Sequence, residues 1–104
     1  MNTAQFHEVM KNSGTKPVLV EFMAPWCVYC RRIAPAMERI EQEQGDSLTI
    51  GYINIDEEPE LAQQEAIELV PTLAIYRDGR LAGTVVAPGS KAAIETFIRE
   101  TLGE

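Results

Sequence analysis

The two cysteines of the chain, Cys27 and Cys30, are separated by two residues and follow an apolar run. This C-x-x-C spacing suits a dithiol that forms and breaks a disulfide, half of a metal site, or a structural disulfide. Unpaired backbone N–H groups and the helix dipole stabilise a thiolate at the start of a helix. If Cys27 opens a helix, it is the expected nucleophile, and Cys30, one turn later, is the expected resolving thiol.

The metal and structural alternatives find little support in the rest of the chain. A zinc site needs about four ligands, and beyond the cysteines the sequence offers one histidine, His7, in a different predicted helix. A disulfide that closes so short a loop would constrain little of the unfolded chain. We therefore expect a redox-active pair, no bound metal and no organic cofactor.

A third candidate is Glu21, which interrupts the apolar run of residues 18–23. On a strand that is covered on one face only, this carboxylate would point to solvent, because acids are seldom buried. In a sheet covered on both faces it would be buried with a raised pKa, and it could then exchange a proton with Cys30. We favour the second alternative, which makes Glu21 a catalytic residue.

The composition limits the partners of the chain. Its 104 residues, 45% hydrophobic and 24% charged, suit a single domain over residues 1–104. The formal net charge of -7 makes nucleic acid and anionic membranes poor partners. No apolar run approaches the roughly 18 residues of a membrane-spanning helix, and the N-terminus lacks a signal-peptide pattern. We expect a cytoplasmic monomer.

Four segments have the apolar spacing of helices, with capping or stop residues at their ends. They are about 3–13, 27–44, 59–66 and 91–102. Asn2 or Thr3 can cap the first helix and Ser90 the last, and glycines follow the first two. Pro35 should kink the second helix, because it lacks an N–H and crowds the preceding turn.

Four further segments have the apolar patterns of strands. They are 16–24, 47–56, 72–76 and 81–86. A helix joins the first two, which predicts a right-handed crossover between parallel strands. Asp78-Gly79 suits a tight turn between the last two, which should be antiparallel. The order predicts an α/β fold, a central mixed β-sheet flanked by helices on both faces.

Two motifs add a family resemblance. The stretch EFMAPWCVYCRRIAP, residues 21–35, resembles the strand and active-site helix of the thioredoxin family, and the chain from INID at residue 53 onward resembles the rest of that fold. The W-C-x-x-C motif, with V-P-T about forty residues later, makes the signal specific. The resemblance covers essentially all of the chain and implies a thioredoxin fold.

The resemblance also implies roles for individual residues. Cys27 would be the exposed nucleophile, Cys30 the resolving thiol, and Glu21 would replace the family's buried aspartate. Pro71 matches the position of a cis peptide bond that faces the cysteines, and the backbone of Val70 would pair with an extended substrate strand. The apolar platform around the disulfide would consist of Trp26, Val70, Pro71, Ala87 and Pro88.

Between the cysteines the chain departs from the family pattern. Val28 and Tyr29 replace the usual Gly-Pro pair. Tyr29 restores a backbone N–H that proline lacks, and this donor would stabilise the Cys27 thiolate. We therefore expect Val28 and Tyr29 to tune the redox potential towards a less reducing value.

Two other positions depart from the family. Tyr52 stands where many members carry a lysine near the buried acid, so Glu21 should be easier to protonate. Glu68 and Leu69 make the rim of the site more acidic and bulkier, which should alter recognition by a flavin-dependent reductase.

Together these features indicate a thiol–disulfide oxidoreductase that reduces disulfide-containing proteins through a mixed disulfide. Its electrons would come from a thioredoxin reductase-type donor. The alternatives are a glutaredoxin-like activity driven by glutathione, an oxidase or isomerase, and a binding module without catalysis.

Overall fold

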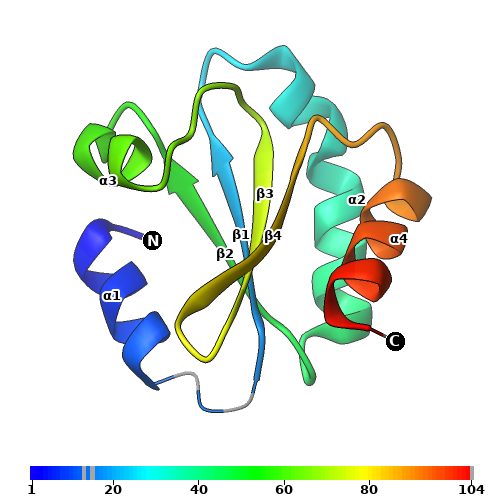
Figure 1. Cartoon of the computed structure of the whole chain (residues 1–104). Coiled ribbons are helices and arrows are strands. Elements are labelled where there is room, and N and C mark those ends of the chain that lie inside the picture. The colour runs from blue at the N-terminus through cyan, green and yellow to red at the C-terminus, as the bar shows by residue number, and fades with distance from the viewer. Residues whose placement is uncertain (13, 15, 104) are drawn as a thin grey trace.

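A four-stranded mixed sheet lies between two pairs of helices in the computed structural model, which describes residues 1–12, 14 and 16–103 (Figure 1). The elements in chain order are α1 Thr3–Asn12, β1 Val18–Met23, α2 Val28–Gln44, β2 Thr49–Asn54, α3 Pro59–Gln64, β3 Thr72–Arg77, β4 Arg80–Val86 and α4 Lys91–Leu102. Their type and order confirm the predicted fold class, and the observed strands begin or end within two residues of the predicted ones.

The strand order β2-β1-β3-β4 determines where the functional edge lies. β1 and β2 are parallel, with Val18 opposite Thr49 and Met23 opposite Asn54. β3 is antiparallel to both β1 and β4. The carboxyl ends of β1 and β2 therefore meet the start of β3 and the end of β4, at the edge where α2 begins (Figure 1).

Side chains of β1 alternate between two cores, which explains its nearly unbroken apolar sequence. In Figure 1, α2 and α4 cover one face of the sheet and α1 and α3 cover the other. Leu19 packs in the first core with residues of α2 and α4, whereas Val20 and Phe22 pack in the second with residues of α1 and α3. Glu21 points to the same face as Leu19, under α2, and is therefore buried.

The helix ends follow local hydrogen bonding. Asn2 caps α1, because its Oδ1 accepts from the Gln5 N–H at 2.8 Å, and the Oγ of Ser90 accepts from the Ala93 N–H at 3.1 Å. The third helix ends two residues earlier than predicted, because Ala66 adopts a positive φ of 58°.

The second helix passes through Pro35 and ends at Gln44. The turn between β3 and β4 is also as predicted, since Asp78 and Gly79 both adopt positive φ angles, 53° and 75°. Such a pair of left-handed residues matches the twist of an antiparallel hairpin.

Candidate active site

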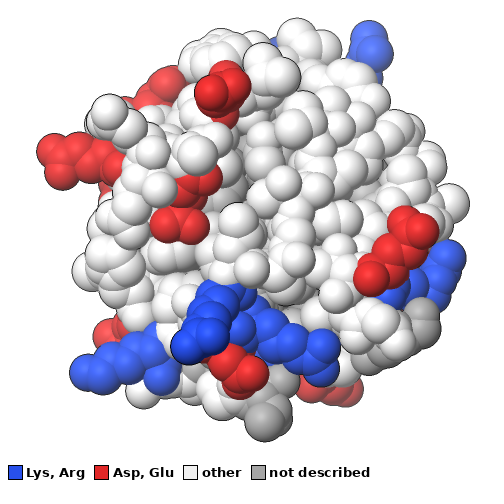
Figure 2. All heavy atoms as spheres, in the orientation of Figure 1, with Lys and Arg blue, Asp and Glu red and all other residues white. Residues whose placement is uncertain are grey.

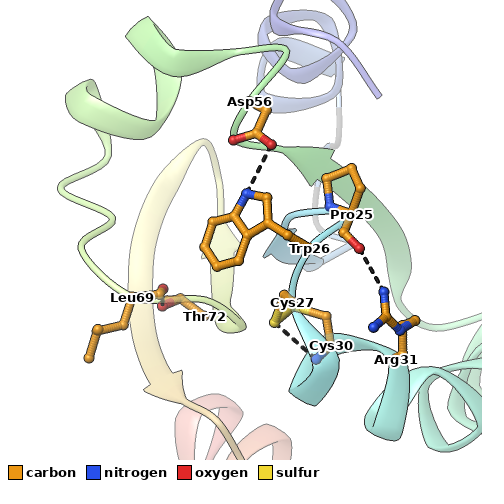
Figure 3. Close-up of a disulfide and its surroundings, with 8 residues drawn as sticks. All are labelled: Pro25, Trp26, Cys27, Cys30, Arg31, Asp56, Leu69 and Thr72. Carbon is orange, nitrogen blue, oxygen red and sulfur yellow. Dashed lines mark hydrogen bonds between the residues drawn. A yellow bond between two sulfur atoms is a disulfide. The ribbon is translucent and has the colours of Figure 1, made fainter.

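Cys27 and Cys30 form a disulfide at the start of α2, with their Cα atoms 5.3 Å apart. Cys27 is the N-cap residue, with extended backbone angles (φ -83°, ψ 104°), and Cys30 lies in the first turn. The N–H of Cys30 donates to the Sγ of Cys27 at 3.0 Å (Figure 3). A sulfur that accepts a helix N-terminal N–H is placed to be stabilised as a thiolate.

The N-cap geometry decides which N–H meets the Cys27 sulfur in the disulfide. The donor is the Cys30 N–H, and stabilisation of the thiolate by the Tyr29 N–H stays a prediction. Cys30 is the donor because an N-cap side chain reaches the N–H of the third helical residue. Tyr29 instead packs its ring, half-buried, against the disulfide.

Burial of the disulfide corrects one expectation. Cys27 and Cys30 are each 5% exposed, so Cys27 is not the exposed residue that the resemblance implied. Both sulfurs pack with Ala24, and four half-buried side chains cover this cluster: Met23, Tyr29, Ile55 and Val70.

Glu21 lies beneath the disulfide and is 3% exposed, so the alternative of a solvent-facing strand position is wrong. Burial raises the pKa of its carboxyl from 4.5 to about 7, because the charged form loses its hydration. Glu21 and Cys30 line the same pocket, whose volume is about 270 Å³. The pocket brings the predicted proton exchanger and the predicted resolving thiol to one space.

Tyr52 closes another side of that pocket. It lies opposite Glu21 in the β1–β2 register, and its hydroxyl donates to Glu41 at 3.2 Å. Burial, followed by the nearby Glu41 carboxylate, raises the pKa of Tyr52 above its ordinary value. Tyr52 is therefore neutral, as expected from a tyrosine where many family members carry a charged lysine.

The loop before β3 also contacts the disulfide, because Val70 packs against the two cysteines. The Val70–Pro71 peptide bond is cis, which confirms the prediction from the resemblance. The Thr72 hydroxyl donates to the Leu69 carbonyl at 2.5 Å, and the Ala87 N–H donates to the Pro71 carbonyl at 2.8 Å. These two bonds hold the loop to β3 and to the end of β4.

The five residues of the predicted platform differ in their accessibility. Trp26 is 63% exposed, Val70 and Ala87 are half-buried, and Pro71 and Pro88 are buried. The two prolines therefore support the surface from below. Val28 and Leu69, which are 56% and 63% exposed, add apolar area on either side.

Asp56 is a site residue that the sequence reasoning missed. The Nε1–H of Trp26 donates to its carboxylate at 3.0 Å, which orients the indole beside the disulfide (Figure 3). Asp56 follows β2, just as Trp26 follows β1, and the carboxyl ends of parallel neighbours lie together. That placement was the available signal, because polar residues after parallel strands gather at one edge.

Figure 2 shows how charge is distributed on the face with the β3–β4 hairpin. Basic side chains gather over the β3–β4 turn, acidic ones lie on the side of α3, and a broad uncharged area extends towards α2. Arg31 lies at the α2 side of the site, where its guanidinium donates to the Pro25 carbonyl at 2.8 Å. The residues that cover the disulfide are thus largely apolar, and Arg31 is the cation on its α2 side.

Within the described residues, no three His, Cys, Asp or Glu side chains come together as metal ligands. His7 is exposed on α1 and contacts the ring of Phe6 edge-on, remote from the cysteines. None of the helices that the structure describes is long and apolar enough to cross a membrane.

Comparison with known proteins agrees with this geometry. A model of the Thioredoxin family matches residues 1–100. The chain is 43% identical to a thioredoxin of Acidithiobacillus ferridurans over 95 residues, 91% of this chain and 86% of that protein. It is 41% identical to thioredoxin 1 of Synechococcus elongatus, over 91% of this chain and 87% of that protein.

A longer relative carries the same region beside another activity. The chain is 37% identical over 82 residues to the bifunctional thioredoxin reductase/thioredoxin of Mycobacterium leprae, which is 79% of this chain and 18% of that protein. Together with the disulfide at the start of α2, these matches show that the chain belongs to the thioredoxin family of thiol–disulfide oxidoreductases.

Proposed function

We propose that the chain works as a protein-disulfide reductase, with Cys27 as nucleophile, Cys30 as resolving thiol and Glu21 as proton exchanger. The observation that carries the proposal is the shared pocket of Glu21 and Cys30, directly behind a sulfur that accepts a helix N-terminal N–H. A reductase must deprotonate its second thiol inside a covered site, and a carboxyl with a pKa of about 7 suits that task.

The reaction begins with the reduced protein. The Cys27 thiolate attacks one sulfur of a substrate disulfide, the substrate S–S bond breaks, and its other sulfur leaves as a thiolate that takes up a proton. A mixed disulfide now joins Cys27 to the substrate. The helix N-terminus stabilises Cys27 both as the attacking thiolate and later as a leaving group.

Resolution requires the second thiol. The Glu21 carboxylate accepts the proton of Cys30, and the resulting thiolate attacks the Cys27 sulfur. The mixed disulfide breaks, the substrate leaves as a second thiolate, and the protein keeps the Cys27–Cys30 disulfide. Two electrons have passed from the protein dithiol to the substrate.

Substrate would dock on the apolar surface around the disulfide. Trp26, Val70 and Ala87 offer accessible area beside the sulfurs, and Pro71 and Pro88 support it. An extended substrate segment would pair with the Val70 backbone, as peptides do when they add a strand to an open edge.

The disulfide produced must be reduced again, and we propose a thioredoxin reductase-type donor acting on a monomer. The bifunctional Mycobacterium leprae relative supports this pairing, since its name joins a thioredoxin reductase and a thioredoxin in one protein. Glu68 and Leu69 lie exposed at the rim, where they would influence which reductase fits. Because the proposed reaction consumes electrons, we propose that it takes place in a reducing compartment, the cytoplasm.

A Cys30→Ser variant tests the order of the two thiols. It should accumulate a mixed disulfide between Cys27 and a protein substrate such as insulin, because attack proceeds but resolution is blocked. Non-reducing electrophoresis with mass spectrometry of the linked peptides would identify the bond. The matched Cys27→Ser variant should form no such adduct, and equal adducts from both variants would contradict the assigned roles.

A turnover assay tests the direction and the donor. Insulin reduction should proceed with a thioredoxin reductase and its nicotinamide cofactor, and should be much slower with glutathione and glutathione reductase. Faster turnover with glutathione would identify the glutaredoxin-like alternative, whereas no turnover with either donor would favour an oxidase, an isomerase or a binding module.

A further inference from the structure

A second pocket adjoins the disulfide surface on the side of β4. Its volume is about 170 Å³, and its walls come from the segment between α3 and β3 and from the outer part of β4. Its lining includes Glu65, Glu68, Leu69, Thr84 and Val86. The reaction proposed above uses none of the side chains that face it.

The pocket is one residue removed from the proposed substrate-pairing position. Val70 packs against the disulfide cluster, and its neighbour Leu69 lines the pocket with a side chain that points away from the disulfide (Figure 3). Adjacent Cα atoms are about 3.8 Å apart. A substrate strand paired with Val70 therefore places some of its side chains over this pocket, because successive side chains alternate in direction.

The walls of the pocket combine apolar area with carboxylates. Leu69 is 63% exposed and Val86 48% exposed, so both offer unpartnered apolar surface. Glu68 is exposed at the mouth, and Glu65 is held in place because its Oε1 accepts from the Tyr76 hydroxyl at 2.6 Å. A long aliphatic stem that ends in a cation matches this combination, since lysine and arginine bury their stems and keep the charge outside.

Basic residues of the chain itself do not cancel this charge. The nearest ones along β4 belong to the hairpin turn, where Arg80 pairs with Arg77. Arg80 is four residues from Thr84, the nearest residue of β4 that lines the pocket, or about 13 Å along the strand, which exceeds a Debye length of about 8 Å at physiological salt. Arg31 lies on the α2 side of the disulfide, bound to the Pro25 carbonyl.

We propose that Glu68 and Leu69 form a specificity subsite that accepts a lysine or arginine side chain of the substrate polypeptide, next to the disulfide under attack. The inference rests on the proposed reductase function and specifies its substrate class. Glu68 and Leu69 are positioned to select substrates, and the chemical step remains with the cysteines. Charge complementarity of this kind acts mainly on the rate of productive encounter.

Matched disulfide peptides test the subsite. The peptides differ only in carrying lysine, norleucine or glutamate at one of the positions that flank the attacked cysteine, and each flanking position is varied in turn. An excess of the reduced protein reduces each peptide in a single turnover. At the position that meets the subsite, wild-type protein should reduce the lysine peptide roughly two- to fivefold faster than the glutamate peptide at low salt. The preference should shrink near 1 M salt, where the Debye length is about 3 Å.

Two charge-reversal variants provide the comparison. Glu68→Lys should invert the lysine-to-glutamate ratio, whereas Glu100→Lys, at an exposed position in the last turns of α4, should keep the wild-type ratio. The ratio cancels any overall change in reactivity of a variant. Leu69→Ser should reduce the advantage of the norleucine peptide over the glutamate peptide, because it removes the apolar wall and leaves only the repulsion between Glu68 and the glutamate.

The outcomes separate the subsite from the underlying function. Equal rates for all three peptides at every position, or the same ratio in Glu68→Lys and Glu100→Lys, would overturn the subsite and leave the reductase function standing. If wild-type protein reduces none of the peptides, the proposed function fails and the subsite fails with it.

Discussion

Glu21 shows how the position of one carboxyl couples stability to reactivity. Its pKa rises from 4.5 to about 7 on folding, because burial removes water from the charged form. The folded protein then binds the proton more tightly than the unfolded chain does. The protonated carboxyl is therefore compatible with the fold, and stability falls as the pH rises from 4.5 through about 7.

A Glu21→Gln variant should remove this pH dependence. In the oxidised protein, where the cysteines do not titrate, its free energy of unfolding relative to wild type should increase by about 3 kcal/mol between acidic and alkaline pH. Urea denaturation across that range measures the difference. Parallel pH profiles for the two proteins would show that folding does not change the pKa of Glu21, and would contradict a raised pKa.

At the scale of elements, the first turn of α2 brings the helix N-terminus to the Cys27 sulfur. Cys30 supplies the N–H that meets this sulfur, and Val28 and Tyr29 lie between the two cysteines with their own helical N–H groups. A proline in the second of these positions would remove one N–H from the same turn. The expected contribution of the Tyr29 N–H to the thiolate would thus add to that of the Cys30 N–H, which already meets the sulfur.

A double variant, Val28→Gly with Tyr29→Pro, tests this contribution. Its disulfide should be more reducing than that of the wild type, by less than about 30 mV, since that step corresponds to a tenfold change in equilibrium. Equilibration with dithiothreitol redox buffers measures the potential. The Val28→Gly single variant is the control, and an equal or higher potential in the double variant would refute a role for the Tyr29 N–H.

The elements were largely predictable because each has a local signal. The valine-rich run of β1, the cap at Ser90 and the Asp78-Gly79 turn depend on residues close together in sequence. The Trp26–Asp56 hydrogen bond and the pocket beside Glu21 escaped prediction, because they depend on how side chains of separate elements meet. Covering of the sulfurs was missed for the same reason.

On the scale of the whole molecule, the two cores are joined through the sheet. β1 and β3 both send alternate side chains to each core: Leu19 and Leu73 to one, Val20 and Ala74 to the other. Loss of either core would expose half of each central strand. We therefore expect the chain to unfold as one cooperative unit, in line with a single domain over residues 1–104.

Two conservative core variants test this cooperativity. Ile40→Val, in the core under α2, and Ile53→Val, in the core under α1 and α3, each remove a buried methylene group and should each cost about 1 kcal/mol. Each should shift a single transition that is the same by far-UV and near-UV circular dichroism. Two separate transitions, of which each variant moves only one, would divide the molecule into independent units.

The exposed indole beside the disulfide has a practical consequence. Trp26 is the one tryptophan of the chain, the residue is 63% exposed, and its indole is oriented by Asp56 at the surface where substrate is proposed to dock. Its fluorescence therefore comes from a single known place. A partner that covers this ring displaces water from it and shifts its emission to shorter wavelength, so the protein carries its own optical label for docking.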